Sequence, residues 1–360
     1  MKILKVYTCN NEFIGGISTM INSYIGSVNI FNNQGCMLNH FNCTPKIQIG
    51  NSKVDNFIYI FTQRREIKKY LSKNKYDLIH IHTSREFLYM KDVLLAKMIN
   101  KKFQTPVVMT IHVGAIETVY NRIKWFKKRS IKLLNKYVSK TIFLSSVMRD
   151  VFVESGLLKE KSTVLYNFYD FTPTTKIYTK TNKLQLLFVG AIHREKGILE
   201  LLKAIELLPD LNYHLNVCGK LTDNTIKEEI EYYKKKLCDK VSFLGYVTGE
   251  NKTLLYKQSD ILILPSYHEG LPIVIMEALG AGCGIMTTPV GAIPEILKRE
   301  NCRWLEIGSY MSIVKQLSNL SNDDLSKMKE ANILLGEKYT LASHINRLCN
   351  IYNSVKLFSR

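Results

Sequence analysis

Short apolar runs alternate with helical patterns along nearly the whole chain, and this alternation restricts the possible folds sharply. In the first half we expect strands at residues 3–8, 57–61, 77–81, 106–111, 141–144 and 163–166. Helices are expected between most of them, near 17–27, 64–72, 86–100, 119–139 and 147–154. Strands that are apolar on both faces and separated by helices indicate a parallel sheet covered on both sides. Residues 29–56 show no regular pattern and receive no assignment.

A second series of the same kind follows the polar stretch 170–183, which is the best linker candidate. Its strands are expected at residues 184–189, 213–217, 241–244, 261–264 and 284–287. A chain of 360 residues is long for one hydrophobic core. The fold class predicted is therefore α/β, with two doubly wound parallel-sheet domains, 1–170 and 171–340, facing a cleft.

The positive charge of the chain is concentrated in its first half. The net charge is +19, and residues 1–170 hold 26 Lys and Arg against 11 Asp and Glu, a balance of +15. Residues 171–360 hold 24 against 20, a balance of only +4. This asymmetry predicts an anionic partner for the first domain, either a membrane surface or nucleic acid.

Several classes of protein are disfavoured by simple patterns. No apolar run reaches the ~18–20 residues that cross a bilayer, and the strand-like start is too short for a signal peptide. The eight cysteines are scattered without a C-x-x-C pair, which argues against a zinc site and for reduced thiols. These features predict a cytoplasmic protein.

The stretch from Ser266 to Gly280 combines a turn, a helix start and two carboxylates. It follows a buried strand, so Glu269 should lie on a loop and Glu277 inside the next helix, which Pro272 suits at its first position. Unpaired N–H groups at such a helix start bind anions. An anion with hydroxyl-bearing groups on both sides describes a nucleotide-diphosphate sugar. The alternative is that both glutamates are ordinary helix-start and helix-surface residues.

The pattern S-x-x-E-G-L-P-x-x-x-x-E-A-x-G resembles the E-x7-E signature of the retaining glycosyltransferases of family 4, which have the GT-B fold. The resemblance implies two Rossmann-like domains, the first (1–170) binding the acceptor and the second (171–340) binding the donor. It also implies a C-terminal helix, 341–360, that packs back toward the first domain. By analogy, Glu277 binds ribose hydroxyls, and Glu269 holds the donor sugar with the backbone of Gly270 and Leu271.

The stretch from Phe188 to Gly197 resembles the family pattern V-G-R-x-x-x-x-K-G. Lys196 matches the family lysine, which offsets the charge of the leaving diphosphate in place of a metal. Ala191 stands where the family has arginine, and Arg194 is the candidate replacement. The alternative for Arg194 is a solvated charge at a helix start. No metal or other cofactor is expected.

Other strand ends carry weaker signals. The strand 107–111 ends in His112, which resembles the family T-x-H-G motif, where the histidine lies beside the donor sugar; a core histidine is the alternative. His80 and His82 share one strand face, so a metal site with His112 is conceivable, although the family motif D-x-x-H-x-H is favoured. The loop Gly15–Gly16 resembles the GT-B loop that reaches the donor, or else is a plain turn. The loop with Tyr246 and Val247 resembles the family loops that hold the nucleotide, so these residues are expected to contact it.

Residues 119–140 form a basic amphipathic pattern without an acidic residue. Such a helix suits an anionic membrane surface, and the alternative is that its apolar side belongs to the domain core. Nucleic acid is disfavoured because no recognition motif is present. The membrane-contacting residues are predicted to be Arg122, Lys124, Lys127, Lys128 and Arg129.

Together these signals predict a metal-independent, retaining glycosyltransferase that uses a nucleotide-diphosphate sugar, most simply a UDP-sugar. Its expected catalytic residues are His112, Glu269 and Lys196. The acceptor would be a glycan or lipid-linked glycan in bacterial surface polysaccharide or lipopolysaccharide synthesis, at the inner face of the plasma membrane. Two alternatives stay open: a GT-B nucleotide-sugar epimerase, and a non-catalytic membrane- or nucleic-acid-binding protein with this fold.

Overall fold

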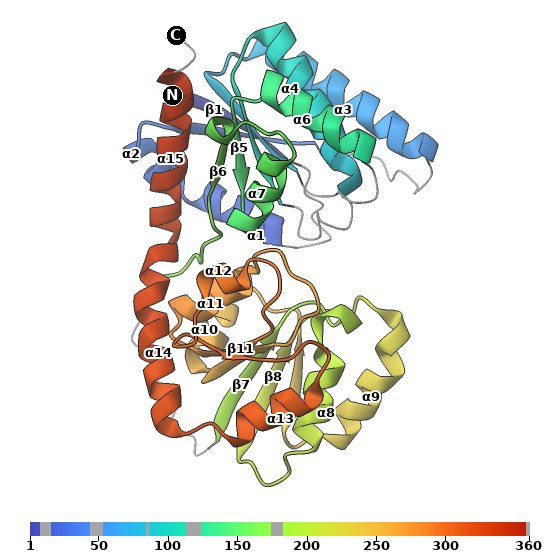
Figure 1. Ribbon diagram of the computed structural model, residues 1–360, viewed down its shortest axis with the longest axis vertical. Coiled ribbons are helices and arrows are strands. Elements are labelled where there is room, and N and C mark those ends of the chain that lie inside the picture. Colours follow the sequence, from blue (N-terminus) through green and yellow to red (C-terminus); the bar gives the residue numbers. More distant parts are fainter. Residues whose placement is uncertain (8–15, 44–52, 84–85, 113–123, 174–182, 358–360) are drawn as a thin grey trace. The chain divides into compact units, whose positions relative to one another are not determined.

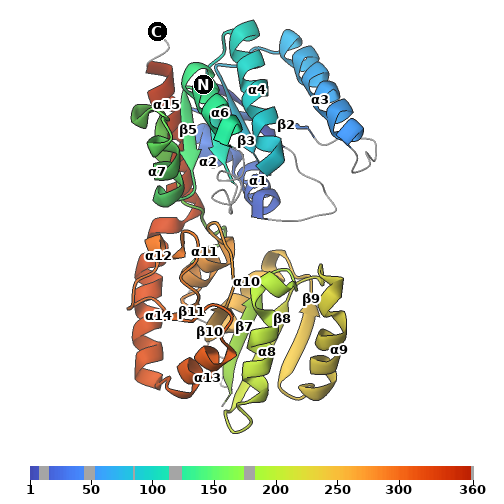
Figure 2. The ribbon, with the colours of Figure 1, turned by 45° about the vertical axis from the view of Figure 1, so that its right-hand side comes forward.

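The computed structural model divides the chain into two compact units, Met1–Tyr166 with Ala342–Arg360, and Asn167–Leu341. It describes all residues except 8–15, 44–52, 84–85, 113–123, 174–182 and 358–360, and no side chains at 16, 53–59, 86–88, 124–127 and 356–357. Each unit contains one six-stranded parallel sheet with helices on both faces (Figure 1 and Figure 2). The predicted pair of doubly wound α/β sheets is confirmed.

The sheet of the first unit has the strand order β2-β1-β3-β4-β5-β6. Edge strand β2 lies in the stretch that received no assignment, and the strands predicted around the other five are confirmed with ends shifted by one or two residues. Their bounds are β1 Lys2–Tyr7, β2 Met37–Asn42, β3 Leu78–Thr83, β4 Val107–Ile111, β5 Lys140–Phe143 and β6 Ser162–Val164.

Helices α3, α4 and α6 lie side by side over one face of this sheet (Figure 2). Their inner sides join a core that includes Ile67, Leu95 and Leu134, packed on Val6 and Ile79 of the strands. The helices of the unit are α1 Gly16–Gly26, α2 Val28–Asn33, α3 Lys53–Lys73, α4 Glu86–Phe103, α6 Lys124–Tyr137, α7 Ser146–Glu154 and α15 Leu341–Leu357, which joins this unit from Ala342.

The strand predicted at residues 57–61 is wrong, because this segment lies inside helix α3. Its run of aromatic and β-branched residues favours a strand locally. Further along the helix, Gln63, Ile67 and Leu71 are buried at a spacing of four residues, which is the period of one helix face. Burial of that face against the sheet therefore outweighs the local preference of 57–61.

The other face of the first sheet is polar and buried. Lys5 of β1 is fully buried and pairs in register with His80 of β3. Its ammonium nitrogen lies 3.2 Å from the centroid of the Tyr24 ring on α1. Burial lowers the pKa of Lys5 well below its ordinary value. A hydrogen bond of 2.7 Å joins His80 Nδ1 to the hydroxyl of Tyr352 on α15, which ties that helix to this face.

The sheet of the second unit has the order β12-β11-β10-β7-β8-β9. All five strands predicted here are confirmed, and the short edge strand β12 was missed. The strands are β7 Leu184–Val189, β8 Tyr213–Cys218, β9 Val241–Gly245, β10 Ile261–Leu264, β11 Gly284–Thr287 and β12 Arg303–Trp304. The helices are α8 Ile198–Glu206, α9 Lys227–Lys236, α10 Gly249–Gln258, α11 Ile273–Gly280, α12 Ile293–Ile296, α13 Tyr310–Ser318 and α14 Asn322–Gly336.

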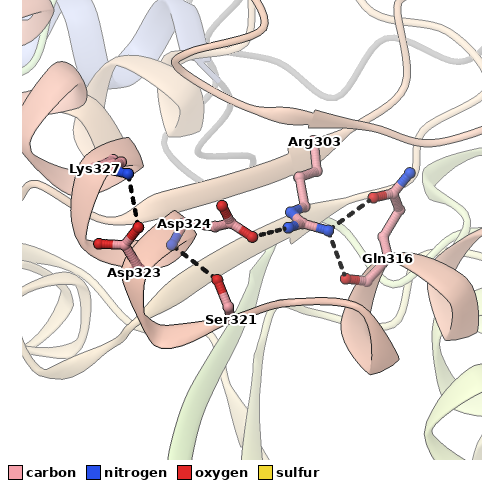
Figure 3. Close-up of polar contacts among 6 residues, drawn as sticks. All are labelled: Arg303, Gln316, Ser321, Asp323, Asp324 and Lys327. Atoms are coloured by element: carbon pink, nitrogen blue, oxygen red, sulfur yellow. Dashed lines mark hydrogen bonds and ion pairs between the residues drawn. The ribbon is translucent and has the colours of Figure 1, made fainter.

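Strand β12 is fixed to α13 and α14 by a network around Arg303 (Figure 3). The guanidinium donates to Asp324 Oδ2 at 2.8 Å and to Gln316 Oε1 at 3.4 Å. The hydroxyl of Ser321 accepts a hydrogen bond from the backbone N–H of Asp324 and caps α14. This network therefore holds the edge of the sheet, where only two residues pair with β11.

Candidate functional site

The strand order of the second sheet fixes where a ligand can bind. From the centre of the sheet, successive strands are added as β7, β8 and β9 toward one edge and as β10, β11 and β12 toward the other. The direction of strand addition therefore reverses between β7 and β10. In doubly wound sheets, ligands bind beyond the carboxyl ends of the strands at such a reversal. The loops that follow β7 and β10 carry Lys196 and Glu269, two of the predicted site residues.

Lys196 and Glu269 meet at this point. The ammonium nitrogen of Lys196 lies 2.7 Å from Glu269 Oε1, and the hydroxyl of Ser266 donates to the same oxygen at 2.8 Å. The side chain of Glu269 is 9% exposed and that of Lys196 is 30% exposed. Both groups are therefore partly withdrawn from water while keeping access to it, which strengthens their interaction with a charged or polar ligand.

Close backbone contacts hold these loops together. Gly197 has φ +69°, and a Cβ there would lie 2.1 Å from the carbonyl oxygen of Pro265. The backbone N–H of Tyr267 donates to the carbonyl of Glu195 at 2.9 Å. Only glycine at 197 permits this approach, so the loop after β7 and the loop after β10 form one frame for Lys196 and Glu269.

Helix α11 begins beside this frame, one residue later than predicted. Pro272 is the N-cap, with extended backbone (φ −70°, ψ 128°), and it makes no side-chain capping hydrogen bond. Proline fits this position because it lacks an N–H group. Pro272 therefore provides no side-chain acceptor for the first N–H groups of α11. An anion-binding helix start needs such N–H groups to face the ligand.

Glu277 lies on α11 and is 7% exposed. Its Oε1 accepts a hydrogen bond of 2.6 Å from the ammonium group of Lys252 on α10. Its Oε2 is buried and makes no hydrogen bond of normal geometry to any residue that the structure describes. The hydroxyl of Tyr256 interacts with this carboxylate without reaching normal hydrogen-bond geometry. A ligand hydroxyl could give the buried oxygen a better-aligned donor.

Lys252 was missed by the sequence analysis. It lies one helical turn before the buried Tyr256, and its side chain is 20% exposed. Burial, followed by the charge of Glu277, raises the pKa of the Tyr256 phenol well above its ordinary value. No motif marks Lys252, because its role comes from the packing of α10 against α11.

The loops that follow β8 and β9 approach the same edge. The N–H of Gly219 donates to the carbonyl of Gly245 at 2.7 Å, and a Cβ at Gly219 would lie 1.7 Å from the carbonyl oxygen of Gly190. Tyr246, which follows β9, is 52% exposed, and Val247 is half-buried. Leu271 is buried and its carbonyl accepts from Asn167, whereas the Gly270 carbonyl accepts from Ala292.

Arg194 does not join the Lys196–Glu269 pair. Its guanidinium lies 3.4 Å from Glu229 on α9, and both side chains are about half exposed, at 53% and 45%. Its backbone N–H donates to Asp223 at 3.3 Å. In this conformation Arg194 interacts with α9 rather than with the loop after β10.

In the first unit, the predicted histidines come together at the ends of β3 and β4. His80 and His82 share one strand face, as predicted, with ring centroids 4.1 Å apart. His82 Nδ1 lies 3.0 Å from His112 Nε2. Burial, and next the charge of Lys5, lowers the pKa of His112 to about 3, so the imidazole is neutral near pH 7. Among the described residues, no group of three or more His, Cys, Asp or Glu could hold a metal ion.

The remaining predicted residues are described only in part. Gly16 begins α1, whereas Gly15 and Arg122 lie outside the described residues. Lys124 and Lys127 belong to α6, but their side chains are not described; Lys128 and Arg129 are exposed. The apolar positions of α6 that are described, among them Ile131 and Leu134, are buried in the core. Within the described part of the chain, no helix is long and apolar enough to span a bilayer.

Two family descriptions match adjoining parts of the chain. Residues 173–333 match "Glycosyl transferases group 1", and residues 39–172 match "Glycosyltransferase Family 4". HepE of Anabaena in complex with UDP-glucose has the same fold: the TM-score is 0.72 at 15% identity, covering 98% of this chain and 99% of that one.

Curated relatives agree with this family. An α-1,4-N-acetyl-D-galactosaminyltransferase of Campylobacter jejuni is 33% identical over 39% of each chain. A UDP-Gal:α-D-GlcNAc-diphosphoundecaprenol α-1,3-galactosyltransferase of Escherichia coli is 23% identical over 80% of this chain and 74% of its own. The first five curated relatives are each matched over 27% to 65% of their own length. The two matched regions, the E-x7-E stretch and the paired doubly wound sheets together show that the chain belongs to glycosyltransferase family 4.

Proposed function

We propose that this chain transfers a sugar from a nucleotide-diphosphate sugar, a UDP-sugar in the simplest case, to a glycan or lipid-linked glycan in bacterial surface polysaccharide synthesis. The observation that carries the proposal is the Lys196–Glu269 ion pair beside the start of α11, where Pro272 provides no side-chain cap. The names of the relatives support the substrate classes. One names UDP-galactose as donor, and both name acceptors linked to undecaprenol through a diphosphate.

In this proposal the diphosphate binds at the start of α11, where backbone N–H groups and Lys196 offset its charge. Lys196 gains a second anionic partner when the donor arrives, because its ammonium group has three donors and Glu269 uses one of them. These groups take the place of a divalent metal in stabilising the leaving diphosphate. No metal is then needed for turnover.

Glu277 would bind the ribose. Its Oε2 is buried beside the helix start and makes no hydrogen bond of normal geometry to a described residue, and Lys252 fixes its other oxygen. A ribose hydroxyl would donate to Oε2 and give this buried oxygen a well-aligned hydrogen bond. Tyr246 and Val247, exposed and half-buried after β9, would then contact the base.

The sugar would be held by Glu269 and by the backbone of Gly270 and Leu271. We propose retention of the anomeric configuration. The acceptor oxygen bonds to the anomeric carbon on the face from which the diphosphate leaves, the bond from that carbon to the diphosphate oxygen breaks, and a phosphate oxygen takes the acceptor proton. Glu269 is not the nucleophile in this scheme. A neutral His112 can donate one ring N–H to a sugar hydroxyl.

We further propose that the first unit contacts an anionic membrane surface by charge. The described apolar side of α6 is occupied by core packing, so it does not insert between lipids. The exposed Lys128 and Arg129 can each add about 1 kcal/mol of attraction to anionic lipid. Flotation with anionic and with neutral vesicles tests this contact: equal binding to both would refute it.

The activity is tested by UDP release from candidate UDP-sugars, with and without a lipid-linked glycan acceptor, in the presence of a chelator. We expect release that depends on the acceptor and a product of retained configuration. Release or isomerisation without any acceptor would instead assign an epimerase. No turnover and no binding of any nucleoside diphosphate would point to a non-catalytic protein.

A further inference from the structure

A basic groove is lined by residues of α3 and α4 in the first unit. Figure 2 shows these two helices side by side. The volume of the groove is about 410 Å³. Its apolar members are Leu94 and Met98, which lie one turn apart on α4, and its other lining residues are cationic. The lining residues are Arg64, Leu94, Lys97, Met98, Lys101 and Lys102.

Like charges crowd together at the rim of this groove. The Lys102 ammonium group lies within hydrogen-bonding reach of Lys68 on α3, and this contact lowers the pKa of Lys102. Two ammonium groups cannot donate to each other, and their like charges repel. A bound anion would accept hydrogen bonds from both lysines and remove their repulsion.

Arg64 adds a donor that no described residue uses. Its Nε is buried and makes no hydrogen bond to any described residue. Burial lowers the pKa of the guanidinium, which marks a charge that is partly removed from water. A planar guanidinium with a free donor is well suited to a phosphate group.

Carboxylates do not balance these charges in the described part of α3 and α4. Glu66 is exposed and lies two residues from Arg64, so it points to another side of α3. Asp92 is buried and pairs with Lys91 at 3.2 Å. The groove therefore concentrates positive charge from both helices without a described acid among its lining residues.

We propose that this groove binds the phosphate group of a lipid. The cations match a compact anion with more than one negative charge, and the apolar Leu94 and Met98 match the carbon atoms of a lipid next to its phosphate. This proposal rests on the proposed membrane contact, because the membrane would supply the lipid. It adds a specific binding site to that contact. It differs from a diffuse basic surface because it predicts selectivity for a phosphomonoester or diphosphate headgroup.

The decisive variant is Arg64→Gln/Lys102→Gln, and its matched control is Lys132→Gln/Lys136→Gln, which removes the same charge from exposed positions on α6. Binding is measured by flotation with phosphatidylcholine vesicles that contain either phosphatidic acid or phosphatidylglycerol. We expect the groove variant to bind phosphatidic acid vesicles about 25-fold more weakly, at about fivefold for each lost phosphate contact, and the control to change by less than about fivefold. Arg64→Lys/Lys102→Arg, which keeps both charges, should retain binding.

Calorimetry with inorganic diphosphate separates the two possible sources of phosphate. Weaker binding of the free anion than of phosphatidic acid vesicles supports a lipid site. Three results would overturn the proposal. The first is that free diphosphate binds as tightly as the phosphatidic acid vesicles. The others are equal losses of vesicle binding in the groove and control variants, and equal binding to phosphatidic acid and phosphatidylglycerol vesicles. UDP binding should be unchanged in the groove variant, so failure here stays distinguishable from failure of the donor site, and unchanged circular dichroism shows that the variants fold.

Discussion

Replacement of Lys252 by methionine tests the geometry around Glu277. Lys252 Nζ lies 2.6 Å from Glu277 Oε1, and the two side chains are 20% and 10% exposed. Lys252→Met keeps the aliphatic volume of the side chain and removes its charge, so Glu277 keeps a charge that is mostly buried and loses its cation. The donor-site account then makes separate predictions for stability and for UDP binding.

The loss of stability should be about 2 kcal/mol. Breaking a fully buried pair by removing one partner costs about 3–5 kcal/mol, whereas exposed pairs contribute about 0.2–1 kcal/mol. This pair lies between those limits because water still reaches the lysine. In the double variant Lys252→Met/Glu277→Gln the stranded charge is gone, so we expect most of the lost stability to return.

Urea unfolding of the wild type, both single variants and the double variant measures the coupling between the two residues. Calorimetry on the same proteins gives UDP affinity. Glu277→Gln should weaken UDP binding by about 10- to 100-fold, the range for a lost hydrogen bond to a charged group. Lys252→Met should weaken it less, because Glu277 Oε2 remains. Additive stability changes, or UDP affinity that survives Glu277→Gln, would refute the reasoning.

Three further predictions follow from the described contacts. Folding holds the pKa of His112 and of His344 at about 3, below the ~6.5 of an unfolded histidine, so between these values the unfolded chain binds more protons. The free energy of unfolding should therefore fall as pH drops from about 6.5 toward 4, by up to about 1.4 kcal/mol per pH unit for each imidazole; a flat urea-midpoint profile would contradict this. Gly219→Ala should destabilise the second unit by more than about 3 kcal/mol in urea unfolding, because its Cβ would lie 1.7 Å from the Gly190 carbonyl oxygen. Gly249→Ala is the control. It has open space around the new Cβ but a positive φ, so it should cost only about 1 kcal/mol. Lys196→Met should lower kcat by about 100-fold without unfolding the protein, and turnover within a few-fold of wild type would remove Lys196 from the site.

The second unit could be predicted almost completely from the sequence. Its strands are short, apolar and bounded by turns, and the strand order brings Lys196 and Glu269 together at the reversal point. Two separate motifs therefore identified Lys196 and Glu269, which lie 73 positions apart and form an ion pair. The edge strand β12 was missed because only two residues pair, which leaves no periodicity to detect.

Other features depend on tertiary contacts that a sequence does not display. Lys252 shows no signal of its own, and its ion pair follows from the packing of α10 on α11. The sequence offered Arg194 as a replacement for the missing arginine but did not show that its guanidinium pairs with Glu229 on α9. Residues 57–61 favour a strand locally, and the buried face of α3 overrides that preference. The basic pattern over 119–140 could not show that the described apolar positions of α6, such as Ile131 and Leu134, are buried in the core.

The central claim is that a nucleoside diphosphate binds at the start of α11 and that protein groups, rather than a metal, offset its charge. Titration calorimetry of UDP into the wild type and into Glu277→Gln, both in excess chelator, tests this claim most directly. The account predicts a clear binding heat for the wild type with chelator present and an affinity about 10- to 100-fold weaker for the variant. Binding that vanishes with chelator and returns with magnesium, or that is unaffected by Glu277→Gln, would contradict it.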